Sequence, residues 1–148
     1  TRIGENSVDL IVTSPPYTRV IRYGKFNWIR LWFFGSTWGD VDDKLFFSQS
    51  IEKYCGFMYE VLKEVRSVLK VGGKAVFVIG DVKSKDSDRI DNLAKVVWEK
   101  CAKPLGFRKR GKIIEDVIRD TTKVSKIWGK KKGNATKIDR ILILERFG

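Results

Sequence analysis

The fold of this chain is constrained most by a strand-like run that stops at two prolines, Val8 to Val12 followed by Thr13-Ser14-Pro15-Pro16-Tyr17. The residues from Val8 to Val12 are mostly apolar and β-branched, which is typical of a buried strand. Two successive prolines cannot continue a sheet, so the strand must end there. The pattern predicts a rigid loop at the carboxyl end of a parallel strand, the edge where open α/β sheets bind ligands.

This loop offers hydrogen-bond acceptors beside an aromatic ring. Proline has no N–H, so the carbonyl groups of Ser14 and Pro15 lie in a stretch poor in competing donors. Ser14 precedes a proline, which favours an extended backbone and points its side chain outward. Acceptors beside the ring of Tyr17 suit a planar group with an amino function, above all a nucleobase taken out of its stack. Acceptors that hold the amino hydrogens favour a more tetrahedral nitrogen, whose lone pair can then attack a methyl group.

The next segments predict a strand–helix–strand unit. Apolar residues recur at three- and four-residue steps over 51–69, which indicates an amphipathic helix with Ser48 or Ser50 as its N-cap and Gly72-Gly73 as its stop. Lys74 to Ile79 is a second apolar strand. A crossover of this length is right-handed and joins parallel strands.

That geometry brings Gly80-Asp81 to the same edge of the sheet as Ser14 and Tyr17. Asp81 therefore either faces the site or caps the segment that follows it. Between the two strands, Arg19 to Asp40 mixes aromatic and cationic residues too irregularly to predict its elements, although Ile29, Trp32 and Phe33 can line one helical face. We expect this segment both to close over a ligand and to cap the core with its tryptophans.

The rest of the chain predicts a helix and a hairpin. Apolar spacing over 90–101 indicates a second helix, closed by Pro104 and Gly106. Strands around Lys112 to Ile118 and Arg140 to Arg146 are separated by a basic loop without helical periodicity, so we expect them to pair antiparallel.

Thr13 to Tyr17 resemble the (S/T/D/N)-(S/D/N/P)-P-P-(Y/F/W) motif of the amino-group nucleic-acid methyltransferases. The Thr-Ser-Pro-Pro-Tyr form is most similar to the branch that methylates cytosine N4 or adenine N6 in DNA. Tyr23 to Gly35 is also similar to a segment that follows this motif in some prokaryotic proteins of this kind. The match covers most of the chain by element order, but only the five-residue motif is specific. It implies an α/β fold: a partial class I, Rossmann-like methyltransferase sheet of parallel strands and crossover helices, ending in an antiparallel hairpin.

The resemblance implies S-adenosylmethionine as the methyl donor and a flipped base as its acceptor. Ser14, Pro15 and Pro16 would then form the catalytic corner that holds the amino group, and Tyr17 would stack on the base. Methyl transfer from a sulfonium needs mainly alignment and a poised nucleophile. It is therefore compatible with a chain that has no histidine, whereas Ser-His-Asp and Cys-His catalysis are excluded.

The donor side of the site is less complete in the sequence. We expect Thr13 and Asp81 to be its cofactor-binding residues. The family's glycine-rich turn, similar to Phe-x-Gly-x-Gly after a strand, does not occur, and Gly72-Gly73 precedes a strand instead. The sequence thus resembles the catalytic half of a methyltransferase, a single domain over 1–148 whose donor-binding half lies elsewhere. The strand at Val8 to Val12 would then be a bare apolar edge, and we expect a homodimer or a partner chain to cover it.

The net charge of the chain favours a polyanionic partner. The resemblance implies that this partner is DNA rather than RNA. The chain carries +12, with eight basic and two acidic residues between Arg119 and Arg140 and five basic residues between Lys103 and Lys112. The alternative is a solvated loop whose charge only maintains solubility. The candidate nucleic-acid contacts are Arg19, Arg22, Tyr23, Lys130, Lys131 and Lys132.

Cysteine usage and hydropathy complete the expectations. Cys55 and Cys101 fall on apolar helical faces and are expected to be buried thiols, so we expect no metal site and a cytoplasmic location. No apolar run approaches the length of a membrane span, so we expect none. Two other functions fit the same residues. One is methylation of an RNA base such as guanine at N2, and the other is a noncatalytic nucleic-acid-binding or subunit domain.

Overall fold

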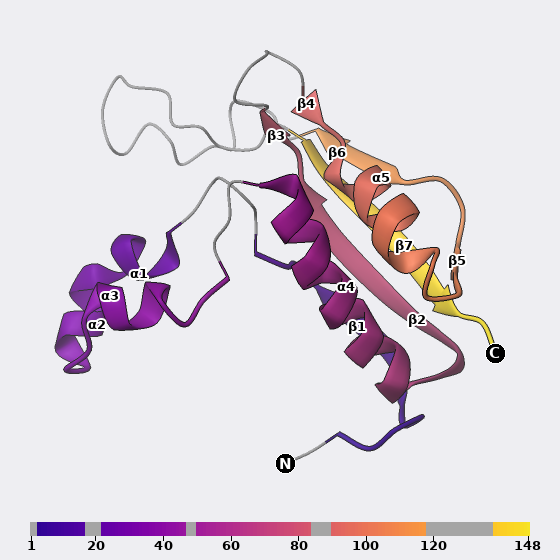
Figure 1. Ribbon diagram of the computed structural model, residues 1–148, viewed down its shortest axis with the longest axis horizontal. Coiled ribbons are helices and arrows are strands. Elements are labelled where there is room, and N and C mark those ends of the chain that lie inside the picture. Colours follow the sequence, from indigo (N-terminus) through magenta and orange to yellow (C-terminus); the bar gives the residue numbers. More distant parts are fainter. Residues whose placement is uncertain (1–2, 17–21, 47–49, 84–89, 118–137) are drawn as a thin grey trace.

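The computed structural model describes residues 3–16, 22–46, 50–83, 90–117 and 138–148. Its main sheet has the strand order β1-β2-β7-β5, and β6 pairs with β7 beside β5 (Figure 1). The strands are β1 (Val8–Thr13), β2 (Leu69–Gly80), β5 (Phe107–Lys109), β6 (Ile114–Val117) and β7 (Ile138–Arg146). A second, two-stranded sheet pairs β3 (Val82–Lys83) with β4 (Ile90–Asp91).

The predicted crossover unit is confirmed. Helix α4 (Ile51–Val68) joins β1 to β2, which are parallel, and Thr13 lies opposite Phe77. Of the two predicted N-caps, Ser50 is the one used, because its hydroxyl accepts from the N–H of Lys53 at 3.3 Å. This cap satisfies one of the free N–H groups at the start of the helix.

The predicted glycine stop of α4 is wrong. The helix ends at Val68, and Leu69 already has an extended backbone that starts β2. Gly72, with φ +81°, and Gly73 lie inside β2, where the register against β1 shifts. A Cβ on Gly73 would lie 2.8 Å from the carbonyl oxygen of Lys70 and 3.1 Å from that of Val8. The glycines therefore allow an irregular strand to approach β1, rather than ending a helix.

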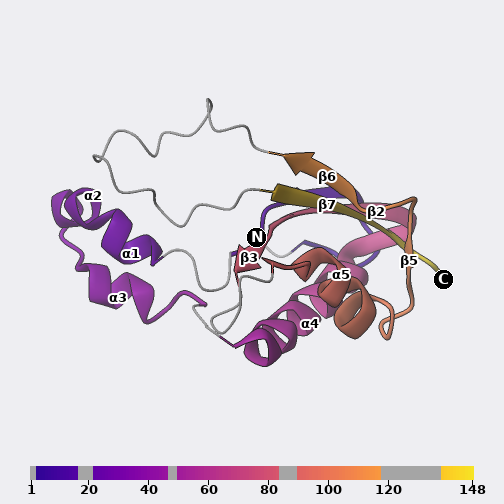
Figure 2. The same cartoon turned by 90° about the horizontal axis from the view of Figure 1, so that it is seen from above.

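The core lies between one face of the sheet and the helices α4, α5 (Leu93–Val97) and η1 (Trp98–Ala102, a π-helical turn), which lie together below the sheet in Figure 2. Its fully buried residues include Met58, Leu62, Phe77, Leu93 and Leu142. The opposite face carries an apolar row, because residues opposite one another in a sheet share a face. Val12 lies opposite Val76, and Val76 lies opposite Ile143. None of the helices that the structure describes packs on this row.

The predicted hairpin is confirmed, since β6 and β7 are antiparallel with Glu115 opposite Arg140. The second helix is also confirmed, but its predicted start is wrong: Ile90–Asp91 form β4, and the helix begins at Leu93 after the N-cap Asn92. Its last turn, η1, is π-helical. Cys101 is fully buried and Cys55 is half-buried, and both are free thiols. Burial raises the pKa of the Cys101 thiol to about 12. No helix in the described part of the chain is long and apolar enough to cross a membrane.

Residues 22–46 form a small helical unit that lies to one side of the sheet (Figure 1). It contains α1 (Tyr23–Phe26), α2 (Trp28–Phe33) and α3 (Trp38–Asp42). A carboxylate oxygen of Asp42 accepts from the N–H of Gly24 at 2.7 Å and ties α1 to α3. We expected the tryptophans to cap the core, and this is wrong: of the described residues in this unit, only Phe46 packs against the core.

Candidate active site

The candidate site begins where β1 ends. Thr13, the last residue of β1, is half-buried and pairs with Phe77 of β2. Ser14 follows as an exposed residue, whereas Pro15 is buried and Pro16 is half-buried. Burial of the Pro15 ring anchors the corner on the protein and leaves the serine at the surface. Tyr17 lies outside the described residues.

Asp81 lies directly after β2, at the same edge of the sheet. The register places Asp81 about three residues, or about 10 Å, beyond Ser14 along the strand direction. The two residues therefore line one edge without being direct neighbours in the ladder. The N–H of Asp81 continues the sheet by donating to the carbonyl of Ile138 at 3.0 Å.

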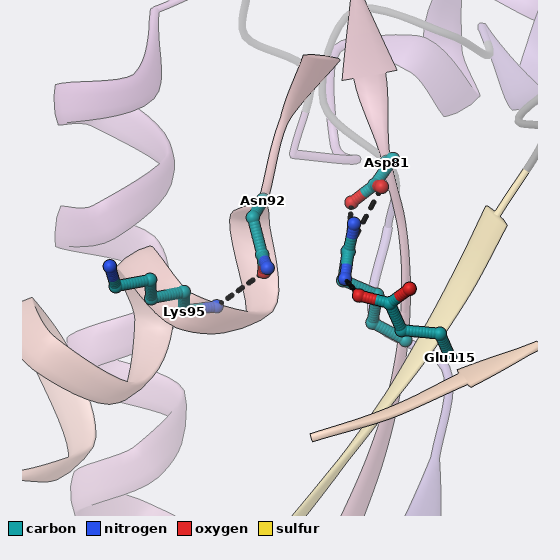
Figure 3. Close-up of polar contacts among 5 residues, drawn as sticks. Asp81, Asn92, Lys95 and Glu115 are labelled. Carbon is teal, nitrogen blue, oxygen red and sulfur yellow. Dashed lines mark hydrogen bonds and ion pairs between the residues drawn. The ribbon is translucent and has the colours of Figure 1, made fainter. Parts of the chain in front are cut away.

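The carboxylate of Asp81 is held by an arginine. Both of its oxygens accept from Nε of Arg140, at 2.8 and 2.9 Å, and a second N–H group of Arg140 donates to Glu115 (Figure 3). The sequence predicted that Asp81 either faces a ligand or caps the next segment, and this ion pair is a contact that it did not predict. These hydrogen bonds fix the orientation of Asp81 and neutralise its charge, because Asp81 is buried and an unpaired buried charge is costly.

The ion pair also defines the electrostatics of this edge. The hydrogen bond with Asp81, and to a lesser degree the one with Glu115, raises the pKa of the Arg140 guanidinium above its ordinary value. The arginine side chain is 11% exposed. A permanently charged arginine therefore joins the end of β2 to β6 and β7.

Sequence reasoning did not identify Arg140 or Glu115 as neighbours of the site. A signal was present, because Arg140 alternates with Leu142 and Leu144 along β7 and so shares their core-facing side of the strand. A cation on that face needs a buried anion. What the sequence could not supply was the identity of that anion, since Asp81 lies far away along the chain.

The predicted nucleic-acid contacts are only partly described. Arg22 is exposed and precedes α1, and Tyr23 is half-buried as the first residue of α1. Arg19 and Lys130 to Lys132 lie outside the described residues. In the basic stretch 103–112, Arg108 lies 3.1 Å from the ring centroid of Phe147 and Arg110 pairs with Glu145 at 3.0 Å. These two cations thus have structural contacts of their own.

Comparisons with known proteins support the fold and the family. A proposed DNA modification methylase of Thermus thermophilus is 25% identical, with a TM-score of 0.56, over 98% of this chain and 48% of that chain. Its structure in complex with S-adenosyl-L-methionine is matched at 24% identity and a TM-score of 0.58, over 98% of this chain and 48% of that chain. The cytosine-N4-specific PvuII DNA methyltransferase, 15% identical, has a TM-score of 0.60 over 97% of this chain and 44% of that chain.

These structures confirm the predicted methyltransferase fold, and this chain spans about half the length of each of them. A search of curated protein sequences gives no match. The family model described as DNA methylase matches residues 8–143, from the start of β1 into β7, and includes the whole Thr13 to Tyr17 motif. The match extends over most of the sequence, and the chain belongs to the DNA methylase family.

Proposed function

We propose that this protein transfers a methyl group from S-adenosylmethionine to an exocyclic amino group of a flipped base in DNA, cytosine N4 or adenine N6. The observation that carries the proposal is the corner at residues 13–16. It ends a parallel strand at the ligand-binding edge of the sheet, with Ser14 exposed and Pro15 anchored. The motif and the family of the chain support the same chemistry.

The corner acts on the amino group of the base. The carbonyl oxygens of Ser14 and Pro15 and the serine hydroxyl accept the amino hydrogens, which makes the nitrogen lone pair available, and Tyr17 stacks on the ring. When bound, S-adenosylmethionine supplies an electrophilic methyl group on a sulfonium. A nitrogen–carbon bond forms as the sulfur–carbon bond breaks, and the amino group then releases one proton to solvent.

The donor side of the described site fits a cofactor that carries its own charge. Thr13 is half-buried at the end of β1, and each oxygen of Asp81 keeps a lone pair after it accepts from Arg140. We propose that these two residues contact the donor. Arg140 neutralises the Asp81 carboxylate, and Glu115 leaves the three-residue cluster with one negative charge, so the edge presents hydrogen-bond acceptors to a donor that carries a positive sulfonium.

We also propose that further polypeptide covers β1. In the described sheet β1 pairs only with β2, and Leu10 and Val12 are more than half exposed on it. An open apolar edge strand invites pairing. A homodimer or a partner chain would cover it, and sedimentation would then show a complex in place of a lone monomer.

The test of the proposed function measures transfer of a tritium-labelled methyl group to mixed-sequence DNA and to folded RNA at one salt concentration. We expect label in DNA, and we expect Ser14→Ala and Tyr17→Ala to lose most of it. Loss of one stacking contact alone weakens base binding by about 1–3 kcal/mol. Ser36→Ala is the matched control, since Ser36 is exposed and lies outside the motif.

Label in RNA alone would replace the DNA proposal by the RNA one. Absence of transfer, together with absence of donor binding in calorimetry, would leave a nucleic-acid-binding domain without catalysis. The lack of a Phe-x-Gly-x-Gly turn in this chain favours that second candidate.

A further inference from the structure

The helical unit carries an exposed aromatic surface that the catalytic proposal does not use. We define this aromatic surface as Phe26, Trp28, Trp32, Phe33 and Phe34. These five side chains are between 58% and 84% exposed, and they lie on α1, on α2 and at the end of α2. Large exposed apolar side chains in such number within nine positions of the chain make this segment a candidate interaction site.

The surface is not part of the folding core. Helix α2 has no buried residue. The unit is held instead by the bond between Asp42 and Gly24 and by a capping box, in which Thr37 and Asp40 satisfy one another's backbone groups. The aromatic rings therefore have little structural role among the residues that the structure describes, and their exposure calls for a partner.

The charge around the surface favours a polyanion as this partner. The sequence contains no acidic residue between Leu10 and Gly39, whereas Arg22, Lys25 and Arg30 lie in or beside α1 and α2. Arg30 is oriented by a 3.0 Å hydrogen bond to the side-chain oxygen of Asn27. The acidic residues of the unit lie on α3 and at its C-cap, where Asp40 and Asp42 already have internal contacts.

The rings themselves favour a partner that exposes flat π-faces. Trp32 and Phe33 meet edge to face, with centroids 5.1 Å apart and planes inclined at 71°. Such a pair restrains both side chains before binding, which lowers the entropy cost of ordering them. Aromatic rings interleaved with cations are the arrangement by which proteins bind single-stranded nucleic acid. In a paired duplex the base faces are stacked on one another, so unpaired bases fit this surface and a closed duplex does not.

The chain connects the helical unit that carries this surface directly to the catalytic corner. Six residue steps separate Pro16 from Arg22, which limits their separation to about 22 Å. When the target base is flipped, its former partner on the opposite strand is left unpaired. We propose, on the basis of the function proposed above, that the aromatic surface binds unpaired bases of DNA opened beside the target base.

The experiment compares two DNA probes at one salt concentration: a duplex with a central bubble of unpaired bases and the same duplex fully paired. We expect the wild-type protein to prefer the bubble. The double variant Trp32→Ala/Phe33→Ala should lose about 5-fold or more of this preference, because one stacked base is worth about 1–3 kcal/mol. The matched control is Tyr59→Ala, an exposed aromatic residue on α4.

A charge variant separates stacking from phosphate attraction. Lys25→Gln should weaken binding to both probes by a similar factor, since phosphate contacts carry no preference for unpaired bases. A second measurement needs no variant: photocross-linking of bromodeoxyuridine in the bubble, mapped by mass spectrometry, should label the peptide over 26–34.

Equal binding of both probes by the wild-type protein would overturn the inference. Cross-links confined to other peptides would also overturn it. A double variant that keeps the preference for the bubble but no longer self-associates would do so too, because the aromatic surface would then be a protein contact. The assay contains no methyl donor. It can therefore fail while methyl transfer succeeds, or succeed while transfer fails, and the two proposals are tested separately.

Discussion

The sheet with its helices and the helical unit of residues 22–46 use the same kinds of large apolar side chain in opposite ways. Phe77 is fully buried in β2, whereas Phe33 on α2 is 75% exposed. The sheet region gains its stability from apolar burial, while the helical unit depends on a few polar contacts and close backbone packing. The difference shows that aromatic content alone does not indicate a core. It separates the sheet region, whose aromatic residues stabilise the fold, from the helical unit, whose aromatic residues we propose bind DNA.

The largest expected effect contrasts two phenylalanines. Phe77→Ala should lower the free energy of unfolding by about 3–5 kcal/mol, because it leaves a cavity in the core. Phe33→Ala should change it by no more than about 0.5 kcal/mol, as is usual for exposed positions. Urea unfolding followed by far-UV circular dichroism measures both. Similar losses in the two variants would show that the aromatic surface is buried in solution.

The next contrast uses two ion pairs with the same 2.8 Å separation, Arg140–Asp81 and Lys70–Asp9. Arg140→Met should cost about 3 kcal/mol, because it leaves the Asp81 carboxylate buried without its cation. Lys70→Met should cost less than about 1 kcal/mol, since both partners are largely solvent-exposed. In the double variant Asp81→Asn/Arg140→Met we expect part of the stability to return. No recovery would mean that Arg140 acts mainly through Glu115.

A smaller effect tests whether the helical unit opens independently of the sheet. A Cβ on Gly24 would clash with the carbonyl oxygen of Trp38, so Gly24→Ala should cost roughly 2 kcal/mol by overpacking α1 against α3. Gly39→Ala is the control, because among the described residues its Cβ would meet only Thr37, at 3.8 Å. Hydrogen exchange should show lost protection within 22–46 alone. Lost protection in β2 and β7 as well would make the two regions one cooperative unit.

The smallest effect is a pH dependence confined to α3. Hydrogen bonds from the hydroxyl and then the N–H of Thr37 lower the pKa of Asp40 below its ordinary value. A lowered folded-state pKa stabilises the helix above the unfolded value of 3.8, and this contribution disappears as the pH falls through the lowered value. Chemical shifts of α3 amides should report the lowered pKa of Asp40 in the wild-type protein and a pKa closer to the ordinary value in Thr37→Ala. An unchanged titration in the variant would contradict the capping box as its cause.

The sequence predicted the crossover unit, the hairpin and the position of the proline corner, because each is encoded by local periodicity or by proline. It misplaced the end of α4. A glycine with positive φ can end a helix or lie in an irregular strand, so the glycine pair alone does not distinguish the two. Leucine is common in both helices and strands, so Leu69 does not show where the helix ends. The helical unit was hard to predict for another reason: α1 to α3 are short and bury almost nothing, so the face of Ile29, Trp32 and Phe33 was too short a pattern to define the elements.

The contact between Asp81 and Arg140 is a different kind of omission. Asp81 could be placed at the ligand-binding edge from strand order, but its cation comes from a strand near the other end of the chain. This contact depends on which strands become neighbours in the sheet. The position of β7 beside β2 cannot be predicted from local patterns in a single sequence.

The central claim is that the corner at residues 13–17 holds the amino group of a DNA base for methylation. Its most direct test is nucleoside mass spectrometry of DNA incubated with the protein and isotope-labelled S-adenosylmethionine. We predict labelled N4-methylcytosine or N6-methyladenine, lost in Ser14→Ala and Tyr17→Ala and kept in Ser36→Ala. Labelled methyl groups on a ring carbon, or on no nucleoside although the donor binds, would contradict the claim.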